Sequence, residues 1–521
     1  MQKHPAPSAS LAALLTLALA ALACTTVQRS MGLAEPPTPA ATPAPPARST
    51  GTAPAAGELP ELAPFRAAMR PEYAGDVDQF AQATRYSITI TVTFPSQSAA
   101  NITGHELIHY TNRQSFPLND LYLMLWPNSG EQYLSQMTMT NVQVNGQALT
   151  PTLENGNLAA HLLLAVPLAP GASVDVSADF FVAAREGMVA NVQARFGLTY
   201  GILLAPTFYP LIPRIVDGHW QTLPAPPGGD TTNSDTALYT WQVTAPANLA
   251  IAGSGTTIST TKSGDTQTQS MVSGPMRDLA LAVGPMEETK RQVGDITLNA
   301  WTLASYANLA GRMLDYAAVQ VQNLQQEVGD YPFAELDVVN APGGFAGIEY
   351  PGEIYIGVVT DDSFLERVVV HETGHQWFYS VIGDDQLLQP WLDEAAASYT
   401  EVLYEEKTHG TQAADRAVES FRQELNYTQN PDLPIGLPIS GYPTQNDYGI
   451  LVYAKGALFF DTLRHTMGDA TFFAFLKAYY AKYRYGFASS SDFEATAEQT
   501  CSCDLKKLFD LWVNQGGPVN P

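Results

Sequence analysis

The chain has 521 residues and carries 26 lysine and arginine residues against 51 aspartate and glutamate residues, a formal net charge of −25. This excess of acidic side chains repels phosphate backbones, so we expect no nucleic-acid partner. Hydrophobic residues make up 45% of the sequence, which excludes a largely disordered chain, and only three cysteines exclude a disulfide scaffold or a cysteine-rich zinc module. Any metal site must therefore be built from histidine and carboxylate side chains.

The N-terminus is predicted to be an export signal. An apolar run from Leu11 to Ala23 follows Lys3 and is too short to span a bilayer, so residues 1–23 are interpreted as a signal peptide. The run ends at Cys24 and resembles a bacterial lipoprotein signal, in which that cysteine carries the lipid. An ordinary secretory signal is the alternative. Residues 24–75 are rich in Pro, Ala and Thr and are expected to be a lipid-anchored spacer that holds an exported protein at the surface of a bacterial membrane.

The folded part is predicted to be a multidomain α+β protein. Residues 76–292 are expected to form an antiparallel β-sandwich or saddle-shaped domain, because Tyr86–Phe94 alternates apolar and polar side chains and turn residues separate further short strands. Residues 293–521 are expected to form a mostly helical domain. Apolar residues recur at helical spacing from Leu309 to Val328, and two short strands then precede further helices.

The motif His-Glu-x-x-His occurs twice, and only a helix makes it a metal site. On a helix the two histidines lie one turn apart on one face. On a strand they share a face but lie roughly 13 Å apart, at about 3.3 Å per residue, and one zinc ion cannot bridge them. The first copy, His105 to His109, lies in an alternating strand pattern. We therefore expect His105 and His109 to be surface residues of a strand and not metal ligands.

The second copy, His371 to His375, lies in a helical pattern that Asp362 or Ser363 can cap. Nineteen residues after His375 comes Glu394, at the start of another predicted helix. Two histidines and one glutamate give three protein ligands to one Zn²⁺ and leave a fourth position for water, as catalytic zinc sites do. The alternative is a buried histidine pair without metal. Glu372 directly follows the ligand His371 and is expected to act as general base on the zinc-activated water.

These residues resemble the aminopeptidase N family of gluzincins, which includes leukotriene A4 hydrolase. The resemblance rests on the second motif, on Gln-Trp-Phe after it, on Trp-Leu-Asp-Glu ending at Glu394, on Gly347-Ile-Glu-Tyr in place of the family's GxMEN, and on Tyr453-Ala-Lys-Gly. It implies a thermolysin-like catalytic domain and, at the end of the chain, a short bacterial form without the family's large C-terminal helical domain. It also implies a peptidase that acts on peptides with free N-termini.

The resemblance implies roles for further residues. Tyr453 is expected to stabilise the oxyanion, with Tyr448 as the nearest rival and a core position as the alternative. Glu349 is expected to bind the substrate's α-ammonium, and Gly347 to let the peptide backbone pass close by. Glu401, seven residues after Glu394, is expected to orient a ligand histidine, and Asp393 could do likewise. Cys501 and Cys503 are predicted to be too closely spaced for an unstrained bridge.

Taken together, the sequence predicts a zinc-dependent metalloaminopeptidase that holds one Zn²⁺ per chain. One alternative is an endopeptidase with the same fold and zinc site. The other is a non-catalytic binding module of the cell surface, built on a peptidase that has lost its activity.

Overall fold

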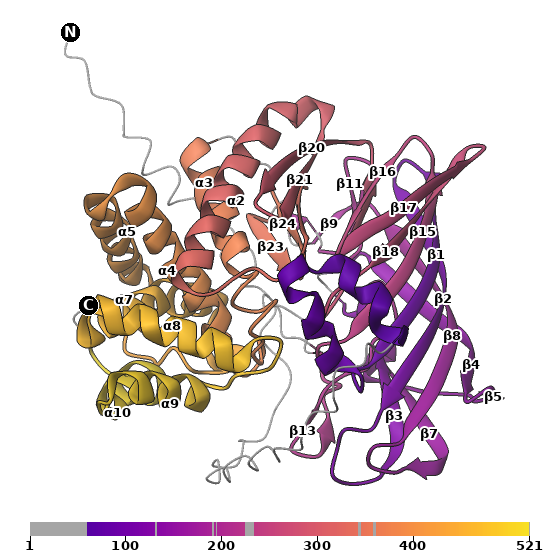
Figure 1. The fold of residues 1–521 in the computed structure, drawn as a ribbon, viewed down its shortest axis with the longest axis horizontal. Helices are drawn as coiled ribbons and strands as arrows, with labels where there is room; N and C mark the ends of the chain where they lie inside the picture. Colours follow the sequence, from indigo (N-terminus) through magenta and orange to yellow (C-terminus); the bar gives the residue numbers. More distant parts are fainter. Residues whose placement is uncertain are drawn as a thin grey trace.

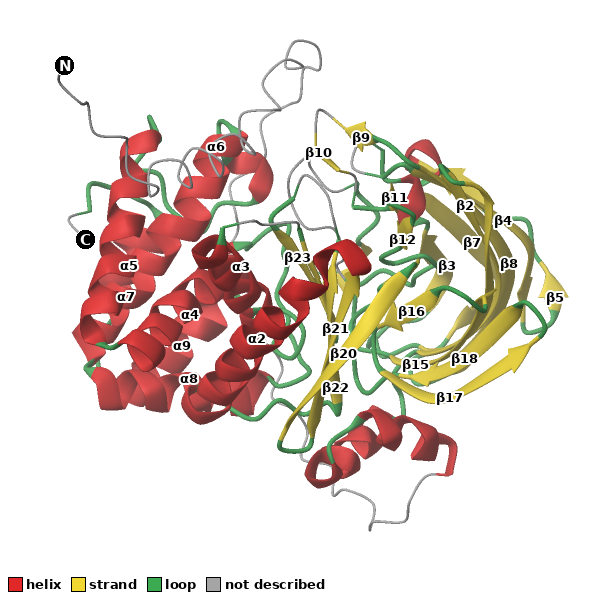
Figure 2. Cartoon of the chain, turned by 90° about the horizontal axis from the view of Figure 1, so that it is seen from above, coloured by secondary structure: helices red, strands yellow, loops and turns green. Residues whose placement is uncertain are grey.

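The structure is a computed structural model that describes residues 60–130, 133–189, 192–193, 195–224, 234–341, 345–357 and 361–519. Strands gather on one side of the molecule and helices on the other, with a smaller sheet between them (Figures 1 and 2). The predicted fold class is confirmed: an N-terminal β domain with several sheets precedes a largely helical C-terminal domain. The predicted signal peptide and Cys24 lie outside the described residues.

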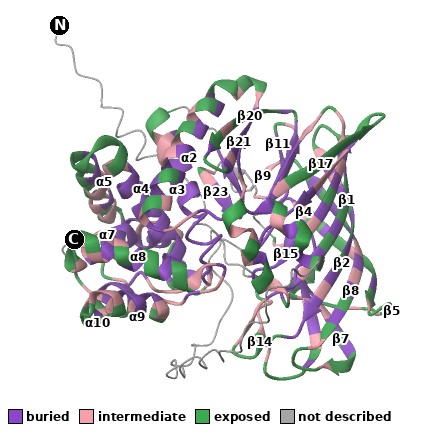
Figure 3. Ribbon diagram, in the orientation of Figure 1, coloured by how far each residue is buried: buried purple, intermediate pink, exposed green. Residues whose placement is uncertain are grey.

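An eight-stranded sheet forms the wall of the β domain, in the order β17-β18-β15-β1-β2-β8-β4-β5. β1 and β15 run parallel, and the other neighbours are antiparallel. Apolar side chains of β1, such as Ile88 and Ile90, are buried and alternate with exposed polar ones, as predicted (Figure 3). The strands are β1 (Arg85–Ser96), β2 (Ala99–Thr111), β4 (Ser135–Val144), β5 (Gln147–Ala148), β8 (Ser173–Arg185), β15 (Leu238–Pro246), β17 (Thr256–Ser263) and β18 (Thr266–Val272).

Smaller sheets complete the β domain. A three-stranded sheet has the order β3-β7-β6, a four-stranded sheet the order β11-β12-β19-β16, and two further sheets have two strands each. Their strands are β3 (Leu118–Met124), β6 (Thr152–Glu154), β7 (Ala159–Leu168), β9 (Met188–Val189), β10 (Val192–Gln193), β11 (Gly197–Thr199), β12 (Ile202–Leu204), β13 (Ile215–Val216), β14 (His219–Trp220), β16 (Ala250–Gly253) and β19 (Leu281–Gly284).

A five-stranded sheet lies between the β domain and the helices, in the order β20-β21-β22-β24-β23. Its strands are β20 (Met286–Val293), β21 (Ile296–Leu303), β22 (Glu335–Asn340), β23 (Gly347–Tyr350) and β24 (Glu353–Ile356). The predicted domain boundary between residues 292 and 293 is corrected, because it would cut the hairpin that β20 forms with β21. An apolar cluster joins this sheet to the β domain, with Ile202 and Ala282 packing near Val339 and Tyr355.

The helices follow in the second half of the chain. They are α2 (Ala307–Glu327), α3 (Asp362–Gly374), α4 (Trp391–His409), α5 (Thr411–Glu424), α6 (Gln445–Tyr448), α7 (Gly456–Met467), α8 (Asp469–Tyr483), α9 (Ser490–Cys501) and α10 (Lys506–Phe509). A π-helical segment, η8 (Gly449–Lys455), joins α6 to α7, and a second one, η9 (Asp510–Asn514), follows α10. None of the helices in the described part of the chain has the length and apolar character needed to cross a membrane.

The predicted spacer ends earlier than residue 75. Two 3₁₀ helices, η1 (Pro60–Ala68) and η2 (Pro71–Phe80), precede the first strand, and Leu62 and Phe65 are buried. The backbone of Arg70 donates a hydrogen bond to Pro332 O, which ties this segment to the C-terminal domain. The spacer prediction failed here because a short segment rich in Pro and Ala resembles a linker in composition, although a few apolar residues suffice to pack it.

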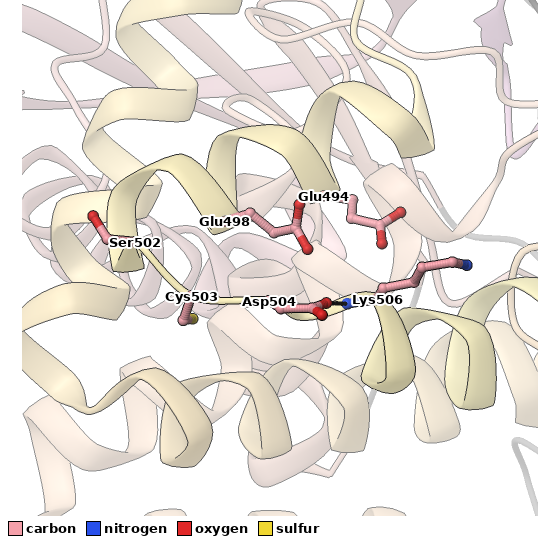
Figure 4. Close-up of a pocket in the computed structure, with 6 residues that line it drawn as sticks. All are labelled: Glu494, Glu498, Ser502, Cys503, Asp504 and Lys506. Atoms are coloured by element: carbon pink, nitrogen blue, oxygen red, sulfur yellow. Dashed lines mark hydrogen bonds between the residues drawn. The ribbon is translucent and has the colours of Figure 1, made fainter.

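The prediction for Cys501 and Cys503 is wrong, since the two residues form a disulfide. Ser502 has a left-handed backbone with φ 53° at the end of α9, and this turn brings the two Cα atoms to 5.2 Å. An open hollow of about 540 Å³ lies beside this turn, lined by Glu494, Glu498, Ser502, Cys503, Asp504 and Lys506 (Figure 4). None of the predicted site residues lines it.

Candidate active site

Helix α3 carries the second motif, and its N-cap differs from the prediction by one residue. Its N-cap is Asp361, which accepts a hydrogen bond from Phe364 N at 3.1 Å, in place of the predicted Asp362 or Ser363. The helix ends at Gly374, and His375 is its C-cap residue with φ −63° and ψ −15°. Because these angles are still helical, the one-turn spacing between His371 and His375 is preserved.

The three predicted metal ligands converge on one point. The Nε2 atoms of His371 and His375 lie 3.1 Å apart, and Glu394 Oε2 lies 3.3 Å from the first and 3.2 Å from the second. Glu394 stands in the first turn of α4, next to α3. Such an open set of two imidazole nitrogens and one carboxylate oxygen fits Zn²⁺ and leaves further coordination positions for other ligands.

The electrostatics of this cluster also suit a cation. Burial works against the charge on His371, but hydrogen bonds with Glu394 and Glu401 raise its pKa to about 9. Burial likewise opposes the charge on His375, yet the carboxylates of Glu349 and Glu394 raise its pKa well above the ordinary value. Burial would raise the pKa of Glu394, but His375 and His371 bring it below the ordinary value. The cluster thus stabilises positive charge.

Both histidines are oriented through their second ring nitrogen. His371 Nδ1 lies 2.9 Å from Glu401 Oε1, which places Glu401 where the sequence predicted it. Glu401 is held in turn by Arg367, whose Nε donates to Glu401 Oε2 at 2.6 Å. His375 Nδ1 lies 3.2 Å from Phe378 O, in the turn that follows α3. These contacts leave both Nε2 atoms facing the common point.

Glu372 lies against the edge strand β23. A Cβ atom built on Gly347 would fall 2.3 Å from Glu372 Oε1, so only glycine leaves room for this carboxylate at its observed position. β23 is held near α3 by Gln376, which accepts a hydrogen bond from Gly352 N at 2.9 Å and donates one to Tyr350 O at 3.0 Å. The glycine and the glutamate therefore meet beside the histidine cluster.

Glu349 is buried in the same strand and joins a small network. Gln386 Nε2 donates to Glu349 Oε1 at 3.0 Å and to Asp393 Oδ2 at 2.9 Å. Asp393 Oδ1 accepts a hydrogen bond from the backbone of Glu394 at 2.7 Å. The hydrogen bonds of Asp393 thus lead to Gln386 and to the backbone of α4, and the predicted orienting contact with a ligand histidine is not among them in the described part of the chain.

Tyr453 lies on the π-helical segment η8 and faces the cluster. Its hydroxyl donates to Glu394 Oε1, and its ring stacks on that of His371 with centroids 5.8 Å apart. π-Helical turns are frequent at functional sites because they shift a side chain out of the regular helical register. Tyr448, the predicted rival, is buried and its ring makes an edge contact with that of Tyr453, with centroids 6.0 Å apart.

The first copy of the motif lies on strand β2, as predicted. His105 and His109 project from the exposed face, where their Nδ1 atoms lie 2.6 Å from Asp179 Oδ1 and 2.7 Å from Asp175 Oδ1. Glu106 points to the opposite face and is fully buried. The two histidines therefore have separate partners and share no binding point.

Two contacts of the site carried no sequence signal. Gln386 is one of three glutamines in the segment between α3 and α4, and nothing in its neighbours predicts that it bonds Glu349. Gln376 belongs to a motif quoted for the family resemblance, but its contact with the hairpin of β23 and β24 depends on the tertiary fold. Alternation and helical spacing predict which face a side chain lies on, and not which distant segment it meets.

Comparisons with known proteins agree with this geometry. Residues 357–512 match the peptidase family M1 domain, a range that includes His371, His375, Glu394, Glu401 and Tyr453. Aminopeptidase N of Streptomyces lividans is 27% identical over 203 residues, which is 36% of this chain and 24% of the relative. Aminopeptidase M1-B of Oryza sativa subsp. japonica is 28% identical over 206 residues, 36% of this chain and 23% of the relative. The chain thus spans about a quarter of these relatives' length.

Solved structures share the fold over most of the chain. The M1 zinc metallopeptidase of Deinococcus radiodurans superposes with a TM-score of 0.64 at 20% sequence identity, covering 84% of this chain and 95% of that protein. A point mutant of the same enzyme, bound to a Tyr-Ser-Ala substrate, gives a TM-score of 0.61 at 20% identity over the same shares of the two chains. The resemblance to the aminopeptidase N family of gluzincins is thereby confirmed, with a peptidase family M1 domain at residues 357–512.

Proposed function

We propose that the protein is a zinc metalloaminopeptidase that removes N-terminal residues from peptides. The observation that carries the proposal is the convergence of His371, His375 and Glu394 on one point. That cluster lies in a domain matched by the peptidase family M1. One Zn²⁺ per chain would be held by these three residues. When bound, zinc supplies Lewis acidity that polarises a carbonyl oxygen and lowers the pKa of water.

The chain's own residues then supply the proton transfers. Glu372 directly follows His371 on α3 and would accept the proton of the attacking water and pass it to the leaving amine. The Tyr453 hydroxyl, which donates to Glu394 in this structure, would donate to the oxyanion that develops on the scissile carbonyl. Its place on an irregular helical segment, stacked on His371, supports this role over that of a core residue.

The preference for a free N-terminus would come from Glu349. Its buried carboxylate lies one strand residue beyond Ile348 and near His375, whose protonated form it stabilises. An α-ammonium bound there would place the first peptide bond, and no later one, at the metal-binding cluster. Gly347 in the same strand leaves room for the Glu372 carboxylate, because a side chain at that position would displace it.

The experiment compares one peptide with a free and with an N-acetylated terminus. Cleavage restricted to the first bond of the free peptide is expected from the native protein, and its loss from the Glu372→Gln variant. Equal cleavage of the acetylated peptide would replace the proposal with the endopeptidase alternative. No cleavage of either form by protein that contains zinc would favour the non-catalytic binding module.

We also propose, from the sequence alone, that the protein is exported and anchored by a lipid on Cys24. The support is the apolar run from Leu11 to Ala23 that ends at this cysteine, and both lie outside the described residues. Labelling of cells with a radioactive fatty acid should mark the native protein in the membrane fraction. Equal labelling of Cys24→Ala would refute the anchor, and Cys501→Ala/Cys503→Ala serves as the matched control.

A further inference from the structure

We propose that Gln386 is a positioning residue that fixes the Glu349 carboxylate for the substrate's α-ammonium; the inference rests on the proposed aminopeptidase function. Its amide nitrogen lies between two carboxylates, 3.0 Å from Glu349 Oε1 and 2.9 Å from Asp393 Oδ2. Hydrogen bonds to ionised groups are among the stronger ones in proteins. One neutral side chain therefore contacts both carboxylates and helps to fix the position of Glu349.

Glu349 needs such a contact because a second carboxylate, that of Asp393, lies close to it in a buried site. One oxygen each of Glu349 and Asp393 and a ring nitrogen of His375 all lie within 4.8 Å of one another. Two carboxylates at this distance repel each other in a buried site. A glutamine amide holds both without adding a positive charge, so the negative charge of Glu349 remains available to the ammonium of a substrate. A lysine or arginine at this position would form an ion pair with Glu349 and compete with the substrate's ammonium.

The segment that carries Gln386 is itself fixed. Asp385 Oδ1 accepts hydrogen bonds from Leu387 N at 3.3 Å and Leu388 N at 3.1 Å, and its other oxygen lies 3.9 Å from Arg214 Nη1 of the β domain. Ile439 N donates to Leu387 O at 3.0 Å. Gln386 thus lies on a short loop that these contacts hold in place, and its hydrogen bond to Glu349 restrains that carboxylate in turn.

The two ends of the Gln386 amide differ in what they contact. Gln386 Oε1 has no hydrogen-bond partner among the residues that the structure describes. A buried carbonyl oxygen left without a partner lowers stability, and an apolar side chain of the same length would avoid that cost. The amide nitrogen donates two hydrogen bonds, whereas the amide oxygen has no partner in the described part of the chain. This asymmetry indicates that the role of Gln386 lies in the carboxylates that its nitrogen contacts.

The test measures binding without turnover. In the zinc-loaded full chain with Glu372→Gln, calorimetry gives the affinity for L-phenylalaninamide and for its N-acetyl derivative. Adding Gln386→Met, which keeps length and removes both hydrogen bonds, should weaken binding of the free amine about tenfold and leave the acetylated compound unchanged. In the otherwise native enzyme, the same change should raise KM for a free peptide more than it lowers kcat.

A matched control is Gln389→Leu, three residues further along the same segment. Gln389 Oε1 accepts hydrogen bonds from Ser490 N and Oγ, so this variant disturbs the segment without touching Glu349. It should leave the discrimination between free and acetylated compounds unchanged. Should Gln386→Met fail to fold, Gln386→Asn keeps the amide but is too short to bridge both carboxylates, and it should weaken the free amine in the same direction.

The outcomes separate the two proposals. If protein with native Gln386 binds both compounds equally well, the aminopeptidase function itself is refuted. If it prefers the free amine and a folded, zinc-containing Gln386 variant keeps the full preference, only the positioning role is refuted. If Gln389→Leu loses the preference to the same extent, general loosening of the segment explains the effect and the role of Gln386 is again refuted.

Discussion

The two copies of the His-Glu-x-x-His motif show how backbone conformation decides what a set of side chains can do. On strand β2 the four-residue step moves about 13 Å along the chain, and His105 and His109 pair with two different aspartates. On helix α3 the same step rises about 6 Å and completes one turn, and the Nε2 atoms of His371 and His375 meet at 3.1 Å. The residue pattern is shared, but only the helix creates a binding point.

The glutamate of each copy differs as much as the histidines do. Alternation on the strand sends Glu106 into the core, where neither carboxylate oxygen has a hydrogen-bond partner within the described part of the chain. The helix keeps Glu372 on the side of the ligand histidines, against Gly347. A functional carboxylate therefore needs a neighbouring strand that leaves space for it, which the motif alone does not supply.

The largest expected effect separates the two histidine pairs. His375→Ala should lose zinc and all peptidase activity, because two remaining protein ligands hold the ion poorly. His109→Ala, the equivalent position of the first copy, should keep one zinc per chain and full activity. Elemental analysis of purified protein checks both. Zinc absent from the native protein, or retained in full by His375→Ala, would contradict the ligand assignment.

The second effect separates the two glutamates. Glu372→Gln should reduce kcat by roughly 10²- to 10⁴-fold with zinc retained, since it removes a proton acceptor and no ligand. Glu106→Gln should leave kcat and KM unchanged. Steady-state kinetics on one peptide, with zinc measured in the same samples, checks the pair. A loss of zinc from Glu372→Gln would mean that this residue holds the metal and does not act as a base.

A smaller effect separates the partners of the histidines. Glu401→Gln removes the carboxylate that faces His371 Nδ1 and should weaken zinc affinity by about 10- to 100-fold. Asp179→Asn changes the partner of His105 in the same way on an exposed face and should leave zinc affinity unchanged. Competition with a chromogenic chelator measures both. Equal zinc affinity of Glu401→Gln and the native protein would show that Glu401 does not support the metal site through His371.

The sequence could predict whatever depends on local periodicity. Alternation in β1, helical spacing around His371 and the strand context of His105 were sufficient for the fold class and for the difference between the two motifs. The resemblance to a known family added Tyr453 and Glu349, which the fold places near the histidine cluster.

Features that depend on long-range contact could not be predicted in this way. The bond between Gln386 and Glu349 joins residues 37 positions apart. The predicted boundary at residue 292 was wrong because β20 has a strand pattern like those of the β domain. In the structure it pairs with β21, which was predicted to belong to the C-terminal domain. The disulfide of Cys501 and Cys503 depends on the left-handed backbone conformation of Ser502, which the sequence pattern does not predict.

The last prediction concerns the buried glutamate of the first motif and the dependence of stability on pH. Burial raises the pKa of Glu106 well above its ordinary value, so the folded protein binds this proton more tightly than the unfolded chain does. The contribution to stability is complete below the unfolded pKa, about 4.3, and is lost as the pH rises from there toward the folded value. Within that window the free energy of unfolding should fall by about 1.4 kcal/mol per pH unit relative to Glu106→Gln, which cannot ionise.

Urea unfolding of the native protein and Glu106→Gln at pH 5, 6.5 and 8, followed by a probe in the β domain, tests this dependence. The stability difference between the two should shift in favour of the variant as the pH rises through the window. Leu107→Gln, on the exposed face of the same strand, is the matched control and should give a difference that does not change with pH. If the free energies of unfolding of the native protein and Glu106→Gln change in parallel with pH, Glu106 has a partner or contacts water. The contrast between the two glutamates would then depend on the position of Glu372 beside Gly347.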